Sequence, residues 1–183
     1  MRKNLGAKEI LYPMPVLIIG TYDKNGKANA MNAAWGGISG DKEICVCIGS
    51  DHKTTQNLIE SKAFTVSIAT EKTEIVSDFV GIVSGKKDEN KMEKSGLTVE
   101  KSEFVNAPLF AQYPLALECE VISYENEHLF GKIVNVCASE EILTDGKIDV
   151  EKLAPITYDP VNFKYYKLNQ IVGNAFSDGK KLK

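Results

Sequence analysis

Histidine, paired cysteines and long apolar runs are scarce in this chain. Its 183 residues include only two histidines, His52 and His128, which argues against a catalytic triad or a histidine-rich metal site. The cysteines form no C-x-x-C pair, and the sequence contains neither G-x-S-x-G nor G-x-G-x-x-G. We therefore expect no bound metal, no hydrolytic nucleophile and no Rossmann dinucleotide site, so any redox chemistry requires a cofactor bound in another way.

Membrane and nucleic-acid partners are not expected either. No apolar run approaches the roughly 20 residues of a membrane-spanning helix, and the N-terminus reaches Lys8 and Glu9 before any long apolar stretch. The 22 basic and 25 acidic side chains give a formal net charge of −3, so a basic nucleic-acid-binding surface is not indicated. These observations predict a cytoplasmic protein.

The apolar pattern predicts a single domain, residues 1–183, of mainly β structure. β-branched and alternating runs predict strands at 16–21, 27–34, 43–49, 64–69, 115–123 and 129–137, and short helices are expected near 57–62 and 74–80. Hairpins are expected at Asn25-Gly26 and at 125–128, a loop at 35–37, and a long irregular excursion at 86–115. Because no parallel β-α-β alternation is visible, we predict an antiparallel barrel with helical insertions.

All four cysteines lie in apolar or alternating stretches. They are Cys45, Cys47, Cys119 and Cys137, and Cys45 and Cys47 are expected on one face of the same strand. We interpret all four as small, reduced, buried apolar residues.

The predicted strand at 27–34 is unusual because its side chains are small or polar. Alanine and asparagine are poor strand formers, yet they alternate through Ala28, Asn29, Ala30 and Asn32. Two interpretations are open: a flat group approaches this strand closely, or the strand is a weak edge strand.

The segment Ser50–Thr55 joins the third strand to a short helix. It brings hydroxyls, Lys53 and free backbone N–H groups to a helix N-terminus, where the dipole favours an anion. The alternative is an ordinary Ser or Asp helix cap. Read together, the small-residue strand, the only tryptophan (Trp35) and this helix start fit a mononucleotide with a planar ring, and FMN is the natural candidate.

At this point the sequence resembles the flavin reductase-like, FMN-binding split β-barrel family, and within it the flavoredoxin group. The resemblance covers nearly the whole chain, and it rests on short motifs in a characteristic order: Asn29-Ala30-Met31-Asn32-Ala33-Ala34-Trp35, Lys53-Thr54-Thr55, Ser84-Gly85, Lys91-Met92, Leu117-Glu118-Cys119, Tyr158-Asp159-Pro160, Tyr165-Tyr166 and 172–177.

The resemblance implies a split barrel of antiparallel Greek-key type that forms a homodimer and binds FMN near the subunit interface. It implies reduction of FMN by NADH or NADPH with no catalytic side chain, since the chemistry takes place on the flavin. Carried over residue by residue, it implies FMN contacts at Asn29, Met31, Asn32, Ala33, Ala34, Trp35, Ser50, Lys53, Thr54, Thr55, Ser67 and Lys91. His128 is either an NAD(P)H contact or part of a solvated hairpin turn.

Four functional hypotheses follow. The first is an oxidoreductase that passes electrons from NAD(P)H through FMN to a flavin, a monooxygenase or another redox protein. The second is a flavoredoxin-like carrier that retains its FMN, and the third is a flavin-binding or storage module without turnover. The fourth is a barrel without flavin, whose small-residue strand packs against its dimer partner.

Overall fold

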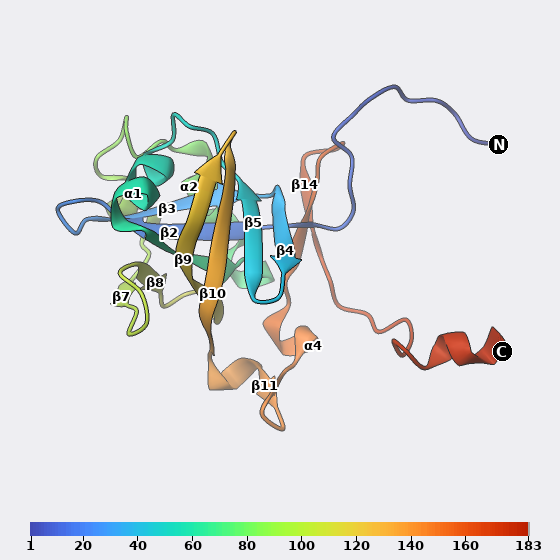
Figure 1. Ribbon diagram of the computed structural model, residues 1–183. Coiled ribbons are helices and arrows are strands. Elements are labelled where there is room, and N and C mark those ends of the chain that lie inside the picture. The colour runs from blue at the N-terminus through green and yellow to red at the C-terminus, as the bar shows by residue number, and fades with distance from the viewer. Residues whose placement is uncertain (183) are drawn as a thin grey trace.

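The fold is built around a seven-stranded antiparallel sheet with the strand order β3-β2-β6-β9-β10-β5-β4 (Figure 1). The computed structural model describes residues 1–182. The strands of the large sheet are β2 (Leu17–Tyr22), β3 (Ala28–Ala33), β4 (Gly36–Gly40), β5 (Glu43–Cys47), β6 (Ala63–Ile68), β9 (Leu115–Glu125) and β10 (His128–Ala138). Both predicted hairpins, β2–β3 and β9–β10, are confirmed.

The sheet curls because its two outermost strands are neighbours in the chain. β3 and β4 lie at opposite ends of the strand order, and only Ala34 and Trp35 separate them. The three steps from Ala33 to Gly36 span at most about 11 Å, so the two edges have to approach one another. The Cys47 amide donates to the Trp35 carbonyl at 2.7 Å across this junction. The predicted antiparallel barrel is thus confirmed as a curled half-barrel.

The predicted loop at 35–37 is wrong beyond its first residue, because β4 begins at Gly36. Gly36 pairs with Val46 and Gly37 with Cys45. Glycine has a low strand propensity, but the backbone hydrogen bonds to β5 override that local preference.

Two apolar clusters occupy the two faces of the sheet. Along β2, Leu17 and Ile19 face the inside of the curl, where they pack with Phe64 and other buried side chains. Ile18 points the opposite way into a second cluster that includes Val80 of helix α2 (Glu74–Ile82). Strand alternation therefore provides one core inside the half-barrel and a second core beneath the helix.

Four short helices and several small strands surround the sheet. The helices are α1 (Lys53–Ser61), α2, α3 (Lys91–Ser95) and α4 (Val150–Leu153), with 3-10 turns at Glu71–Thr73, Glu140–Ile142 and Asp178–Leu182. The remaining strands are β1 (Met14–Pro15), β7 (Val99–Lys101), β8 (Pro108–Phe110), β11 (Leu143–Thr144), β12 (Lys147–Ile148), β13 (Ile156–Asp159) and β14 (Lys164–Lys167). None of the helices in the described residues combines the length and apolar character needed to cross a membrane.

The segment 86–115, predicted to be irregular, contains α3, β7 and β8. A buried polar network anchors it to the sheet: the Glu118 carboxylate on β9 accepts hydrogen bonds from the Ser102 hydroxyl and the Asn135 amide. These partners are distant in sequence, so the local polar composition does not indicate that the segment 86–115 is ordered.

The prediction of four buried cysteines holds only for Cys119. Cys45 and Cys47 do share one face of β5, as predicted, but Ile44 and Val46 take the core face. Cys45, Cys47 and Cys137 are therefore half-buried, and all four thiols are free.

The two ends of the chain leave the body of the molecule on the same side (Figure 1). The N-terminal arm, residues 1–13, exposes Leu11, and the C-terminal tail, residues 168–182, exposes Val172 and Phe176. Both segments thus carry large apolar side chains that the rest of the chain does not cover.

Candidate functional site

The start of helix α1 has no side-chain cap. Its N-cap residue, His52, makes no side-chain capping hydrogen bond, and the first helical turn contains no acidic residue. The first turn instead carries Lys53 and Thr54, while backbone N–H groups and the helix dipole favour negative charge there. The alternative of an ordinary Ser or Asp cap is wrong, because His52 occupies the N-cap position. Ser50 lies before it, and its amide and hydroxyl donate to the Glu127 carboxylate at 3.0 and 3.2 Å.

A cavity of about 140 Å³, here called the inner cavity, lies between this helix start, strand β3 and the chain that follows α2. Six of the predicted site residues line it: Asn29, Met31, Asn32, Lys53, Thr54 and Lys91. These residues come from β3, α1 and α3, so the fold gathers three separate segments at one place.

Close packing fixes the wall of the inner cavity. The buried Asn29 amide donates to the Thr54 hydroxyl at 2.9 Å, which ties β3 to the start of α1. A Cβ at Gly85 would lie only 2.5 Å from Asn29 Oδ1, and one at Gly81 would lie 3.0 Å from Asn32 Cβ. Glycine at these positions lets the last turn of α2 and the chain just after it approach β3 at a distance that a side chain would prevent.

Two lysines bring positive charge to the inner cavity. Lys53 Nζ lies 3.1 Å from the Asp23 carboxylate. Lys91 is only 4% exposed, and its ammonium donates to the Val80 carbonyl at 2.8 Å near the C-terminus of α2. Burial lowers the pKa of Lys91 to about 8. The cavity therefore brings together an ion-paired lysine, Lys53, and a buried lysine, Lys91, whose charge depends on pH.

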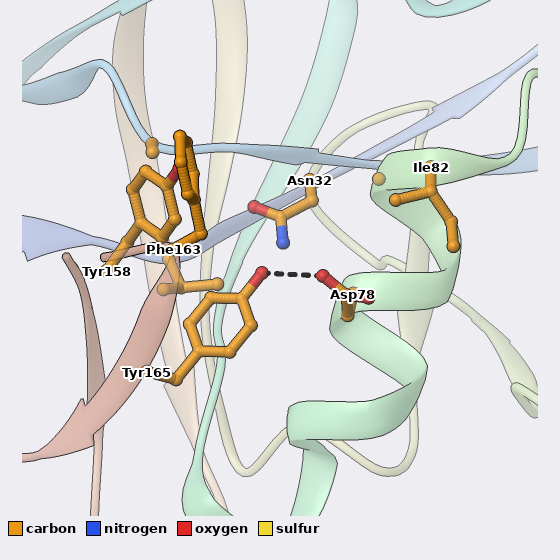
Figure 2. A pocket seen from close by; sticks show the side chains of 9 residues that line it. Asn32, Asp78, Ile82, Tyr158, Phe163 and Tyr165 are labelled. Carbon is orange, nitrogen blue, oxygen red and sulfur yellow. Dashed lines mark hydrogen bonds between the residues drawn. The ribbon is translucent and has the colours of Figure 1, made fainter. Parts of the chain in front are cut away.

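A second cavity of about 350 Å³, here called the outer cavity, adjoins the first and shares Asn32, Gly81 and Ile82 with it. Figure 2 shows Tyr158, Phe163 and Tyr165 along one side and Asp78 of α2 opposite. The Tyr165 hydroxyl donates to Asp78 Oδ1 at 2.9 Å. Burial, the hydrogen bond to Asp78 and its negative charge all raise the pKa of Tyr165. Tyr165 therefore stays protonated at neutral pH.

With this geometry in place, the chain can be compared with known proteins. A family model described as a flavin reductase like domain matches residues 10–163. The chain belongs to this family.

Solved structures extend this flavin reductase-like assignment. Flavoredoxin of Desulfovibrio vulgaris (Miyazaki F) is 35% identical with a TM-score of 0.94, and the match covers 98% of this chain and 100% of that one. Flavoredoxin from Methanosarcina acetivorans is 26% identical with a TM-score of 0.89, covering both chains completely. An FMN-binding domain of a flavin reductases-like enzyme from Shewanella baltica is 17% identical with a TM-score of 0.79, covering 87% of this chain and 88% of that one. The resemblance to the flavoredoxin group and the split-barrel fold are thus confirmed.

Four of the residues predicted to contact FMN, Ala33, Ala34, Trp35 and Thr55, do not line the inner cavity. Ala34 lines the outer cavity, and it also lines, with Trp35, a groove beside the N-terminal arm. Ala33 belongs to the core inside the curl. The Thr55 hydroxyl donates to the Gly49 carbonyl at 2.7 Å, so it is already occupied by the backbone.

Ser67 and His128 are not brought to either cavity. Ser67 on β6 is buried, and its hydroxyl has no hydrogen-bond partner within residues 1–182. His128 begins β10 at the exposed end of the hairpin, where Nδ1 lies 2.7 Å from the Asn126 carbonyl. Their roles stay predictions from the resemblance.

Asp78 and Tyr165 escaped the sequence reasoning as functional residues. Tyr165 belongs to the family-like Tyr165-Tyr166 motif, and Asp78 lies in the helix predicted near 74–80. The aromatic residues at 163–166 were the available signal in the sequence. Their carboxylate partner, Asp78, could not be found in this way because 87 positions separate it from Tyr165.

Proposed function

We propose that the protein is an FMN-binding oxidoreductase that takes electrons from NADH or NADPH and passes them through FMN to a flavin or a protein acceptor. The observation that carries this proposal is the uncapped start of α1, which shares one cavity with Lys53 and Lys91 beneath a strand of small residues. Family membership and the similarity to flavoredoxins support it.

The residues fit FMN at both of its ends. The first amides of α1, the Thr54 hydroxyl and Lys53 would hold the phosphate, with Lys91 behind them. The planar ring would lie along the end of β3, where Asn32 and Ala34 leave room for a flat group. FMN supplies the hydride and electron transfer, and the side chains bind and orient it. In this proposal Met31 lines the inner cavity beside the ligand, and Ala33, Trp35, Ser50 and Thr55 lie around it. Ser67, one strand further away, stays a contact that only the resemblance implies.

We propose further that two copies of the chain associate. The exposed apolar side chains of the N-terminal arm and C-terminal tail support this, since surfaces of this kind are usually covered by a partner. The acceptor beyond the dimer is proposed to be a redox protein, a monooxygenase or free flavin.

A second candidate function is that of an electron carrier that keeps its FMN and turns over NAD(P)H slowly. The likeness to two flavoredoxins over essentially the whole chain favours this candidate over a flavin storage module.

An anaerobic absorption titration tests both candidates. The purified protein is reconstituted with FMN, and the flavin band is followed after addition of NADH or NADPH. Bleaching at a rate that sustains turnover with added free flavin supports the oxidoreductase. Retained flavin that NADH or NADPH bleaches only slowly supports the carrier, and failure to bind FMN overturns the proposal.

A further inference from the structure

Three cavities follow one another along strand β3. A third cavity of about 290 Å³, here called the rear cavity, adjoins the inner cavity, and four residues line both: Asn29, Lys53, Gly85 and Lys91. Along β3, Ala28 lines the rear cavity, Asn29 lines the rear and inner cavities, and Asn32 lines the inner and outer cavities. The outer cavity thus adjoins the ring end of the proposed FMN site, and the rear cavity adjoins its phosphate end.

Two flavin nucleotides differ in what they would place in the rear cavity. FMN ends at its single phosphate, whereas FAD continues through a second phosphate to adenosine. With the ring and the first phosphate held alike, the second phosphate of FAD would pass Lys53 and enter the rear cavity. At about 290 Å³, against about 350 Å³ for the outer cavity, the rear cavity has room for a further group of comparable size. Room therefore does not separate the two nucleotides, and the charges of the wall decide.

The charge of the cavity walls changes at Lys53. Lys53 and Lys91 line the inner cavity, and no carboxylate among the described residues does. The rear cavity adds one lysine, Lys27, and three carboxylates: Asp23, Asp88 and Glu89. The wall of the inner cavity thus has an excess of positive charge, whereas the wall of the rear cavity has none.

Each lysine that lines the rear cavity already has a partner within residues 1–182. Lys27 Nζ donates to the Glu89 carbonyl at 2.6 Å. The other two are Lys53, which pairs with Asp23, and Lys91, which donates to a backbone carbonyl near the C-terminus of α2. A second phosphate would therefore have to displace one of these contacts.

The turn of the β2–β3 hairpin fixes Asp23 in this wall. The Asp23 side chain is 12% exposed, and its Oδ1 accepts hydrogen bonds from the Asn25 amide at 2.9 Å and the Lys27 amide at 3.0 Å. Its Oδ2 lies 3.1 Å from Lys53 Nζ. Asp23 lines the rear cavity but not the inner one, so its carboxylate lies on the rear side of Lys53.

We infer that Asp23 is a specificity-determining residue that selects FMN over FAD by excluding a second phosphate from the rear cavity. The inference rests on the proposed function, because it takes the first phosphate to lie at the start of α1. FMN would keep the nearly two negative charges of its phosphate within the inner cavity, whose wall carries no carboxylate among the described residues. The second phosphate of FAD would instead lie beside the Asp23 carboxylate, and like charges at short range in a partly buried site repel one another.

Equilibrium binding of three flavins measures this selection directly. Isothermal titration of the purified protein, freed of flavin, gives the dissociation constants of riboflavin, FMN and FAD. Wild type should bind FMN at least about tenfold more tightly than FAD. Asp23→Asn keeps an acceptor for the turn amides and removes the charge, so it should raise FAD affinity about tenfold, FMN affinity less than about threefold and riboflavin affinity less than about twofold.

Two further variants control this measurement. Asp23→Glu keeps the charge and should retain the preference for FMN, and Asp41→Asn, which changes an exposed carboxylate between β4 and β5, is the matched control with wild-type affinities. Should Asp23→Asn fail to fold in thermal melts, Asp23→Ser keeps a hydroxyl acceptor for the turn and provides the same test.

An unchanged ratio of FMN to FAD affinity in a folded, uncharged variant would overturn the inference, as would a wild type that binds both nucleotides equally. A wild type that binds neither nucleotide would instead overturn the proposed function, so the two failures are distinguishable.

Discussion

Replacing Lys53 by methionine tests the phosphate end of the proposed FMN site, because methionine keeps the apolar length and removes the charge. Lys53 is 28% exposed and lies at the inner cavity beside the uncapped start of α1. A hydrogen bond to a charged group contributes about 1.5–3 kcal/mol, and each ~1.4 kcal/mol changes a dissociation constant tenfold. We therefore expect Lys53→Met to weaken FMN binding about 10- to 150-fold.

Asp23 modifies this expectation because it shares Lys53 with the incoming phosphate. Burial alone would raise the pKa of Asp23, but hydrogen bonds from the Lys27 amide, Lys53 and the Asn25 amide together lower it, so Asp23 is ionised at neutral pH. In Lys53→Met the Asp23 carboxylate loses its partner and repels the phosphate. The double variant Asp23→Asn/Lys53→Met should consequently bind FMN more tightly than the single variant.

The assay compares FMN with riboflavin, which carries the same ring without the phosphate. Flavin fluorescence quenching gives both dissociation constants, and Lys147→Met on the exposed β12 is the matched control. Lys53→Met should leave riboflavin affinity within about twofold, and its FMN affinity should depend less on salt. An equal loss for both ligands would refute the reasoning, since it would show that Lys53 acts through the fold rather than on the phosphate.

Three further predictions follow from the same contacts. Gly85→Ala should push Asn29 off Thr54 and lower the free energy of unfolding by about 1–3 kcal/mol, measured by denaturant titration, and FMN affinity should fall with it. Lys91, with a pKa of about 8, should lose its charge between pH 7 and 9.5, so FMN affinity should decline over that interval in wild type and stay flat in Lys91→Met. Asp159 accepts hydrogen bonds from Tyr12, the stronger effect, and from Asn162, and these lower its pKa to about 2. The stability that Asp159 contributes should therefore be present above pH 4 and lost between pH 4 and 2. Thermal melts of Asp159→Asn should show a weaker decline of melting temperature over that range.

Local sequence signals were sufficient wherever the site is local. The start of α1 combines a strand end, hydroxyls and Lys53 within six residues, and the structure places Lys53 and Thr54 together as expected. The hairpin at Asn25-Gly26 is equally local. These features depend on neighbouring residues, so turn and helix-end chemistry predicts them.

Strand order is what the sequence could not supply. Ser67 and Asn32 share one face of the sheet, but both pair in register with Ile18, which lies between them on β2. Ser67 is therefore separated from the inner cavity by a whole strand, although the family-like pattern places it among the flavin contacts. The outer cavity is missing from the sequence analysis for a similar reason, because Asp78 and Tyr165 meet only through the packing of β14 and α2.

Two interpretations of the small-residue strand are open from the sequence: a flat group approaches it closely, or it is a weak edge strand. In the structure the two are compatible. β3 ends the strand order, so it is an edge strand that pairs only with β2. An edge strand presents backbone N–H and C=O groups that no neighbouring strand occupies. Because Asn29 and Asn32 carry short side chains, the start of α1, together with Gly81 in the last turn of α2 and Gly85 just after that helix, can close around that edge and leave a cavity there. In the proposed FMN site, the weakness of the strand as a sheet element is thus the condition for its use as a binding surface, and replacing Ala34 by a larger side chain should abolish FMN binding while leaving the sheet intact.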